Sequence, residues 1–254
     1  MDDVRPRPTT RKELAEIIDY ALLAPASGEA EVHAGCLLAR SLGLASVVVR
    51  PSDVEMAALA LEGCAVRVGS VAAFPHGNAT TAVKLYEVND LLRRGAREIG
   101  LTLNAGKMRS RQFAHIESEM MQAASACRSA GALFGMVIEP GGMDPDLKVI
   151  ACRVAKRVEA DWLTLGSGFG AAFAAPAEAA FFAERLAGRV AIRVGFAAAD
   201  LEGCLTLYEA GCARLVAADP AAILAEWDKR LEKEKAGPGD GQAAGQTPQP
   251  KPKP

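Results

Sequence analysis

Eight short apolar runs recur along this chain, and their regular alternation with helical patterns constrains the fold more than any other feature. The runs begin roughly 20 to 35 residues apart, and the stretches between them carry apolar residues at helical spacing. Strands that alternate with helices through short connections favour a parallel sheet, and eight such units favour a closed barrel. The predicted strands are residues 18–23, 46–50, 66–74, 98–104, 134–139, 162–166, 190–195 and 213–217.

The alternative to a barrel is a doubly wound open sheet, and two features argue against it. No G-x-G-x-x-G sequence opens a helix after the first predicted strand, and the glycine-rich segment at 166–170 follows the sixth strand and lacks the Walker lysine. A chain of 254 residues suits one barrel domain. Glycines also stand where the helices should end, just before strands, at Gly43, Gly95, Gly131, Gly188 and Gly211. The sequence therefore predicts an α/β fold, a single-domain (β/α)8 TIM barrel of eight parallel strands.

Two terminal segments are predicted to lie outside this barrel. Residues 1–9 are polar and read as a flexible arm, so the barrel is expected over residues 10–235. Residues 236–254 are rich in Pro, Gly and Gln, and such a segment buries too little apolar surface to offset its ordering entropy. We therefore predict a disordered tail, whose most economical interpretation is a solvated linker or tether.

Composition excludes several classes of function. The net charge of −2 gives no general attraction to nucleic acid or to an anionic membrane, and no apolar stretch reaches the length of a membrane span. The six cysteines form neither a C-x-x-C pair nor a cysteine–histidine cluster with zinc spacing, so they are expected to be buried free thiols and no metal or cofactor is expected. No apolar segment near the start resembles a secretory signal, and a cytoplasmic protein is predicted.

Chemistry in a barrel of this type sits at the carboxyl ends of the strands. The polar residues expected there, and hence the candidates for ligand binding, are Asp19, Asn104, Glu139, Ser167, Gly168 and Asp219. Lys107 is the only lysine predicted near the mouth, and His76 follows the third strand in a Phe-Pro-His-Gly turn. The simpler interpretation is a solvated loop lysine for Lys107 and a hydrogen-bonded loop histidine for His76.

Five segments, in order, resemble motifs of deoxyribose-phosphate aldolases. Residues 45–51 resemble the motif of the second strand, and FPHGNATT at 74–81 resembles the F-P-L-G-A-x-x-T turn of that family. Further on, residues 95–106 resemble G-A-D-E-I-D-M-V-I-N-x-G, 137–139 resemble the fifth strand, and GSGFG at 166–170 resembles the end of V-K-T-S-T-G-F-G. The resemblance spans nearly the whole predicted barrel and implies the same fold.

Three positions that the resemblance marks as catalytic carry different residues. The family forms a Schiff base through a lysine on the sixth strand, and Thr164 stands at that position. A second lysine, on the seventh strand, lowers the pKa of the first; that position reads as Arg193, which cannot exchange a proton near neutral pH. The fourth-strand aspartate that handles protons reads as Gly100. These changes are hard to reconcile with the ordinary mechanism.

The positions that bind substrate phosphate in the family have changed as well. The turn after the seventh strand reads Gly195-Phe196-Ala197, which places bulk where the family has glycines. After the eighth strand, Asp219 and Pro220 form a strong helix start, with Asp as N-cap and Pro at the first helical position. A carboxylate at that helix end is expected to disfavour a phosphate there.

Two functions remain open from the sequence. The first is a non-catalytic scaffold, regulatory subunit or assembly partner that pairs with itself or with an active paralogue. The second is a divergent lyase that acts on deoxyribose phosphate or another small aldehyde through relocated residues, with Lys107 and His76 as candidates.

Overall fold

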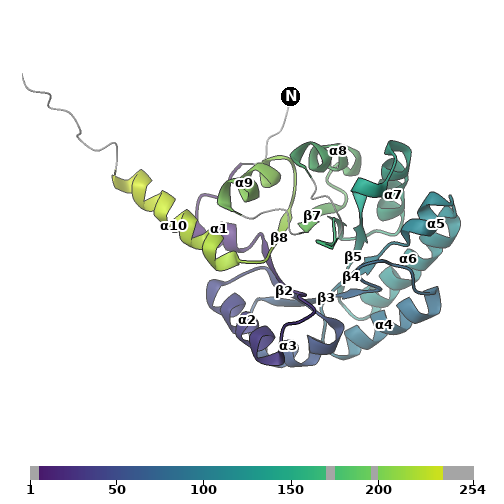
Figure 1. Ribbon diagram of the computed structural model, residues 1–254, viewed down its shortest axis with the longest axis horizontal. Coiled ribbons are helices and arrows are strands. Elements are labelled where there is room, and N and C mark those ends of the chain that lie inside the picture. Colours follow the sequence, from purple (N-terminus) through teal and green to yellow (C-terminus); the bar gives the residue numbers. More distant parts are fainter. Residues whose placement is uncertain (1–5, 170–174, 196–199, 237–254) are drawn as a thin grey trace, which may run out of the picture.

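The computed structural model describes residues 6–169, 175–195 and 200–236 and shows a closed barrel of eight parallel strands (Figure 1). Each strand pairs with its neighbours in chain order, and β8 closes the sheet against β1. The strands are β1 (Ile18–Leu22), β2 (Ser46–Val49), β3 (Arg67–Ala72), β4 (Glu98–Thr102), β5 (Leu133–Ile138), β6 (Trp162–Leu165), β7 (Ala191–Gly195) and β8 (Arg214–Ala217). The predicted fold is confirmed, and every strand lies within one of the predicted runs except at the first residue of β5.

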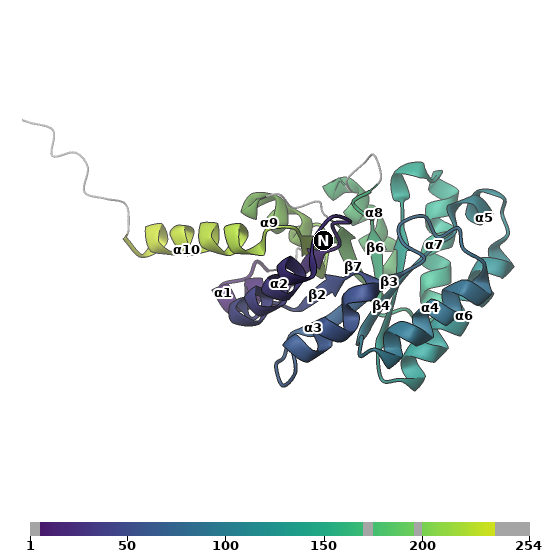
Figure 2. The same ribbon diagram turned by 60° about the horizontal axis from the view of Figure 1, so that its bottom comes forward.

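Helices follow the strands and form the outer layer around the barrel (Figures 1 and 2). They are α1 (Arg11–Ala15), α2 (Glu29–Leu42), α3 (Val54–Ala60), α4 (Thr81–Arg93), α5 (Ala105–Arg109), α6 (Phe113–Ser129), α7 (Pro145–Arg157), α8 (Pro176–Leu186), α9 (Leu201–Glu209) and α10 (Pro220–Ala236), with 3-10 turns η1 (Pro51–Asp53) and η2 (Pro140–Gly142). At the end of α2, Gly43 adopts φ 68°, the left-handed conformation that glycine tolerates best. The end of α10 extends away from the barrel in both views.

The apolar core has two parts because successive strand residues face opposite sides of the sheet. In β4, Ile99 and Leu101 belong to the large core between the sheet and the helices, whereas Gly100 faces the interior of the barrel. A second, smaller cluster, made of Leu23, Val48, Val71 and Phe74, fills part of that interior near its carboxyl end. The interior is thus partly occupied by side chains before any ligand is considered.

The chain ends show how far the predicted domain limits can be followed. In the predicted arm, Pro8 is buried and Arg7 forms an ion pair with Glu209 of α9, while residues 1–5 lie outside the described part. Of the predicted tail, Ala236 is the last residue of α10, and the rest, from residue 237 on, lies outside the described part. The start of α10 is confirmed, since an Asp219 carboxylate oxygen accepts a hydrogen bond from the backbone N–H of Ala222 at 3.0 Å.

Five of the six cysteines are buried as expected, and the described residues contain no disulfide. Burial raises the pKa of the Cys36 and Cys152 thiols to about 11 and those of Cys127 and Cys204 to about 12, so these groups stay protonated near neutral pH. Among the described helices, none combines the length and the hydropathy that crossing a bilayer requires.

Candidate functional site

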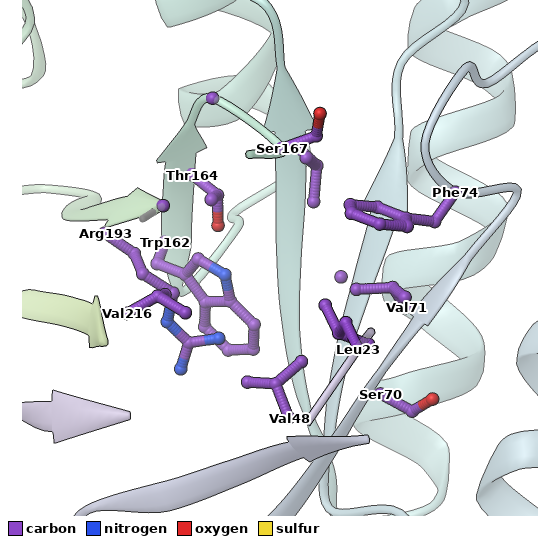
Figure 3. A pocket seen from close by; sticks show the side chains of 14 residues that line it. Leu23, Val48, Ser70, Val71, Phe74, Trp162, Thr164, Ser167, Arg193 and Val216 are labelled. Atoms are coloured by element: carbon purple, nitrogen blue, oxygen red, sulfur yellow. The ribbon is translucent and has the colours of Figure 1, made fainter. Parts of the chain in front are cut away.

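A cavity opens in the barrel interior toward the carboxyl ends of the strands (Figure 3). Its walls are mostly apolar and include Leu23, Val48, Val71, Phe74, Val137 and Val216. The volume open to the centre of a water-sized molecule is about 30 Å³. Since one water needs roughly 10–15 Å³ on that measure, the cavity holds about two or three waters.

Thr164 lies on the wall of this cavity, at the sixth-strand position that the sequence singled out. It is the third residue of β6, pairs with Val137 and Arg193 on the neighbouring strands, and is 7% exposed. Trp162 lines the same cavity, which confirms the expectation that it shares the inner face with Thr164. No lysine of the described residues lines the cavity.

Arg193 of β7 lines the cavity, and its guanidinium pairs with two carboxylates toward the amino-terminal end of the barrel. Its Nε lies 2.9 Å from Asp19 Oδ2, and its Nη2 contacts Glu98 Oε2. The guanidinium carbon also lies 4.1 Å from the centroid of the Trp162 ring, within the range of a cation–π contact. The positive charge is therefore compensated and is held against the indole.

These contacts belong to a buried ion-pair layer across the amino-terminal end of the barrel. We define the layer as Asp19, Glu98, Arg193 and Arg214; Arg214, the first residue of β8, bridges both carboxylates. Glu98 is the first residue of β4, and Asp19 accepts a hydrogen bond from Ser46, the first residue of β2. The expectation that Asp19 lies at the mouth is therefore wrong, because Asp19 is the second residue of β1 and pairs with the first residue of β2, at the end where the strands begin.

The layer perturbs the acidity of its central carboxylate. Burial by itself would raise the pKa of Glu98. The attraction of Arg193 and Arg214 and the hydrogen bonds from Arg193 and Arg67 together outweigh burial and lower the pKa to about 2. Glu98 therefore stays ionised at any pH at which the protein is ordinarily studied. The sequence did not mark it, because the partners come from strands far apart in the chain.

Two glycines shape the interior. A Cβ on Gly135 would lie 2.0 Å from Cε2 of Trp162, so the absence of a side chain on β5 leaves the space that the indole occupies. A Cβ on Gly100, where the resemblance implies an aspartate, would lie 3.1 Å from a Val137 methyl carbon. The indole thus fills the interior next to β5, and position 100 of β4 carries no side chain that could handle a proton.

The turn after β3 places an aromatic ring on the cavity wall. The backbone N–H of Ala73, which has φ 54°, donates to Glu87 Oε2 of α4 at 2.7 Å. The next residue, Phe74, lines the cavity and meets Phe169 edge to face with ring centroids 5.4 Å apart. Gly77 completes the turn where a Cβ would lie 2.3 Å from the Leu103 carbonyl oxygen. Sequence reasoning missed Glu87, which gives no local signal of its contact with the turn.

The two relocated catalytic candidates do not line the cavity. Lys107 Nζ is hydrogen-bonded to Gln112 Oε1 at 3.1 Å, and His76 is exposed. His76 instead borders a separate depression of the mouth that also includes Glu139 and Thr102. The structure therefore does not bring His76 and Lys107 together with Thr164.

The remaining candidate residues stabilise loops at the mouth. Asn104 caps α5 by accepting a hydrogen bond from the Lys107 N–H at 3.0 Å. Glu139 Oε1 accepts from the Ser167 N–H at 2.6 Å, and the Ser167 hydroxyl accepts from the Phe169 N–H at 3.1 Å. Gly168 has φ 81° within this turn. Of these residues, Ser167 also lines the cavity.

One fully buried lysine was not considered from the sequence. Lys84 of α4 donates to Glu119 Oε1 of α6 at 2.7 Å and to the Thr102 carbonyl oxygen at 2.9 Å. Burial lowers its pKa, although Glu119 acts in the opposite direction. The amine lies in the layer between helices and sheet and is not part of the cavity.

Comparison with known proteins gives consistent relatives in sequence and structure. The chain is 31% identical over 212 residues to the deoxyribose-phosphate aldolase of Streptococcus pneumoniae serotype 19F (strain G54), which covers 84% of this chain and 96% of the relative. It is 28% identical over 213 residues to that of Clostridium perfringens (strain 13), covering 84% and 95%. No family model matches the chain.

Solved structures share the fold at lower identity. A putative deoxyribose-phosphate aldolase from Coccidioides immitis superimposes with a TM-score of 0.83 at 22% identity, covering 88% of each chain. A deoxyribose phosphate aldolase from Aeropyrum pernix, described as having a unique tetrameric structure, gives 0.81 at 21% identity, covering 88% of this chain and 94% of that one.

Proposed function

Since the chain belongs to the deoxyribose-phosphate aldolase family, we propose that it is a member without Schiff-base chemistry, which acts as a non-catalytic scaffold, regulatory subunit or assembly partner. The observation that carries the proposal is the environment of Thr164. An imine requires a primary amine at the carbonyl carbon, and a threonine hydroxyl cannot provide one. No lysine in the described part of the chain lines the cavity on which Thr164 lies.

The residues around Thr164 support the same conclusion. A guanidinium at position 193 keeps its proton near neutral pH, and its two carboxylate partners hold it in place. Gly100 offers no group that could accept a proton from a substrate. The amine, the group that tunes it and the proton relay, all implied by the resemblance, are therefore missing together.

The small volume of the cavity also supports the proposal that the chain no longer binds a pentose phosphate there. A pentose phosphate has about 13 non-hydrogen atoms, and pockets that enclose a small-molecule ligand usually have volumes of several hundred Å³. The space of about 30 Å³ next to Thr164 holds only a few waters. The Asp219 carboxylate at the start of α10 further disfavours a phosphate at that helix end.

Binding to a partner protein is a role that fits a chain in which the barrel framework is retained. The partner we propose is a second copy of the chain or an active paralogue in the cytoplasm. The description of the Aeropyrum pernix relative as tetrameric supports self-association as the simpler of the two.

Reductive trapping tests the absence of imine chemistry. We expect intact mass spectrometry to find no adduct after incubation with acetaldehyde or with deoxyribose 5-phosphate and borohydride, because no amine meets the substrate in the cavity. The Streptococcus pneumoniae aldolase, treated in parallel, should acquire one. An adduct on a single lysine, removed by Lys107→Ala, would instead establish the relocated lyase.

A further inference from the structure

We infer that the depression beside His76 is a second binding site, separate from the barrel cavity, and that it takes a free α-amino acid with a hydrocarbon side chain. The depression lies at the carboxyl ends of β3, β4 and β5, where His76, Thr102 and Glu139 border it. The volume open to the centre of a water-sized molecule is about 360 Å³, which suits a small ligand, against about 30 Å³ for the barrel cavity. Such a site does not require the loss of imine chemistry, because an amino acid carries neither an aldehyde nor a ketone.

Three residues of this depression are polar where the motifs they resemble are apolar. The motifs F-P-L-G-A-x-x-T and G-A-D-E-I-D-M-V-I-N-x-G have leucine, alanine and valine at the positions of His76, Asn78 and Thr102. These residues come from two separate segments of the chain, and the fold brings all three to one depression. Polar side chains that gather in space but not in sequence indicate a change in what the depression binds.

A buried hydroxyl without a partner borders the depression. Thr102 is 3% exposed, and its Oγ1 forms no hydrogen bond with any described residue. Glu98 and Gly100 of the same strand face the barrel interior, so alternation along β4 places the Thr102 side chain on that face at the mouth. Buried polar groups are nearly always paired, and a polar ligand beside Thr102 supplies the missing hydrogen bond.

The depression offers one charge of each sign. Arg109 of α5 lines it and has no side-chain partner among the described residues. Glu139 uses Oε1 to accept the Ser167 N–H, whereas its Oε2 has no partner in the described part of the chain. A simple anion is repelled by the Glu139 carboxylate and a simple cation by the Arg109 guanidinium, so a zwitterion matches the site best.

The strand register sets the orientation of the amino acid. Glu139 follows two residues after Val137, the β5 partner of Thr102, so the side chains of Thr102 and Glu139 project from neighbouring strands. The ammonium group of the ligand donates to the Glu139 carboxylate and the Thr102 hydroxyl. Arg109, on the helix after β4, binds the ligand carboxylate through two parallel hydrogen bonds.

The apolar residues of the depression favour a hydrocarbon side chain on the ligand. Pro75, Leu103 and Met143 line it. L-Leucine combines such a side chain with both charges, and we use it as the probe. Two analogues keep the hydrocarbon part and lose one charge each: 4-methylpentanoate lacks the ammonium group, and 3-methylbutylamine lacks the carboxylate. Glucose tests a neutral polyol.

The histidine ring signals in proton–carbon NMR spectra, recorded at fixed pH, provide the measurement. The chain has three histidines, His33, His76 and His115, and His76→Asn identifies the His76 signal. L-Leucine is expected to shift this signal saturably, with a dissociation constant of about millimolar given its roughly nine non-hydrogen atoms. The signals of His33 and His115 should stay in place. Each analogue should bind about 10-fold more weakly or worse, because it leaves one charge of the site unmatched.

Matched variants test the two ends of the ligand. Arg109→Gln should weaken leucine binding about 10-fold or more, the value of a hydrogen-bonded charge pair. Arg111→Gln removes an exposed guanidinium nearby that pairs with Asp146, and neither of these residues lines the depression, so the affinity should not change. Thr102→Val should weaken binding about 3- to 10-fold without lowering the urea midpoint, since its unpaired hydroxyl adds nothing to the fold. A lower midpoint with unchanged affinity would overturn the binding role of Thr102.

The outcomes distinguish this site from the proposed function. A saturable His76 shift that requires both charges of leucine and weakens in Arg109→Gln supports the inference. No saturable shift, an equal shift with either analogue or with glucose, or an equal loss in Arg111→Gln would overturn it. Each of these results leaves the proposed function intact, because imine chemistry is tested by borohydride trapping. The comparison of leucine with its analogues uses the unmodified chain and does not depend on whether a variant folds.

Discussion

The Glu98→Gln variant is expected to lose about 3–5 kcal/mol of unfolding free energy, the cost of removing one partner from a buried ion pair. Glu98 is 1% exposed, and its carboxylate meets Arg193 and Arg214 inside the barrel and Arg67 at its edge. Glutamine keeps the shape but leaves two guanidinium groups in the buried layer with Asp19 as their remaining carboxylate. Urea denaturation at neutral pH measures the loss.

A matched control separates this buried effect from a general loss of charge. Glu55→Gln removes a carboxylate that is 70% exposed and lies 3.5 Å from Arg94. An exposed pair of this kind contributes about 0–1 kcal/mol, so the control should be near neutral. Similar small losses in both variants would show that the ion-pair layer does not stabilise the barrel.

Acid should weaken the same layer in the unmodified protein. The folded pKa of Glu98, about 2, lies below its ordinary value of 4.5, so the folded state favours the ionised form. Its contribution to stability is complete above pH 4.5 and disappears as the pH falls toward 2. Urea midpoints measured across this window should therefore decline less steeply in Glu98→Gln than in the unmodified chain, and identical slopes would contradict the assignment.

Trp162→Ala is expected to cost about 3–5 kcal/mol, because it removes a large buried ring and leaves a cavity around it. The indole packs against the Arg193 guanidinium and into the space beside Gly135. Thermal or urea unfolding measures the loss. Tyr86→Ala, at an aromatic residue that is 71% exposed, should change stability by no more than about 0.5 kcal/mol.

A double-mutant cycle tests the proposed fit between the indole and the glycine. Gly135→Ala alone should destabilise the protein by about 1–3 kcal/mol, since the new Cβ would overlap the indole. In the Trp162→Ala background the same substitution should cost little, because the ring is gone. Additive losses from the two substitutions would mean that Gly135 does not accommodate Trp162.

The strands and the inner-face position of Thr164 could be predicted because they depend on local patterns. A buried parallel strand is a short apolar run, and alternation along β6 places Trp162 and Thr164 on one face whatever the neighbouring strands do. The N-cap of α10 could also be predicted, because an Asp-Pro pair is a local sequence signal for the start of a helix.

The ion-pair layer could not be predicted, because its contacts join residues that are far apart in the chain. Arg193 and Glu98 are 95 positions apart, and Arg214 and Asp19 are 195 apart. The position of Asp19 along its strand was also read from the polar mouth expected of a barrel, whereas the strand register sets it near the other end. The contacts of Glu87 and Lys84 depend on helix packing for the same reason.

The ion-pair layer also makes the two ends of the barrel different. Asp19 and Glu98 have fully buried side chains, and Arg193 is nearly so, which closes the end at which these strands begin. Among the described residues, the cavity lies on the other side of this layer, toward the carboxyl ends of the strands, where Phe74 and Ser167 line its wall. A molecule that enters the cavity from the carboxyl end must leave by the same end before another can bind. A side chain that slows entry there therefore slows release as well.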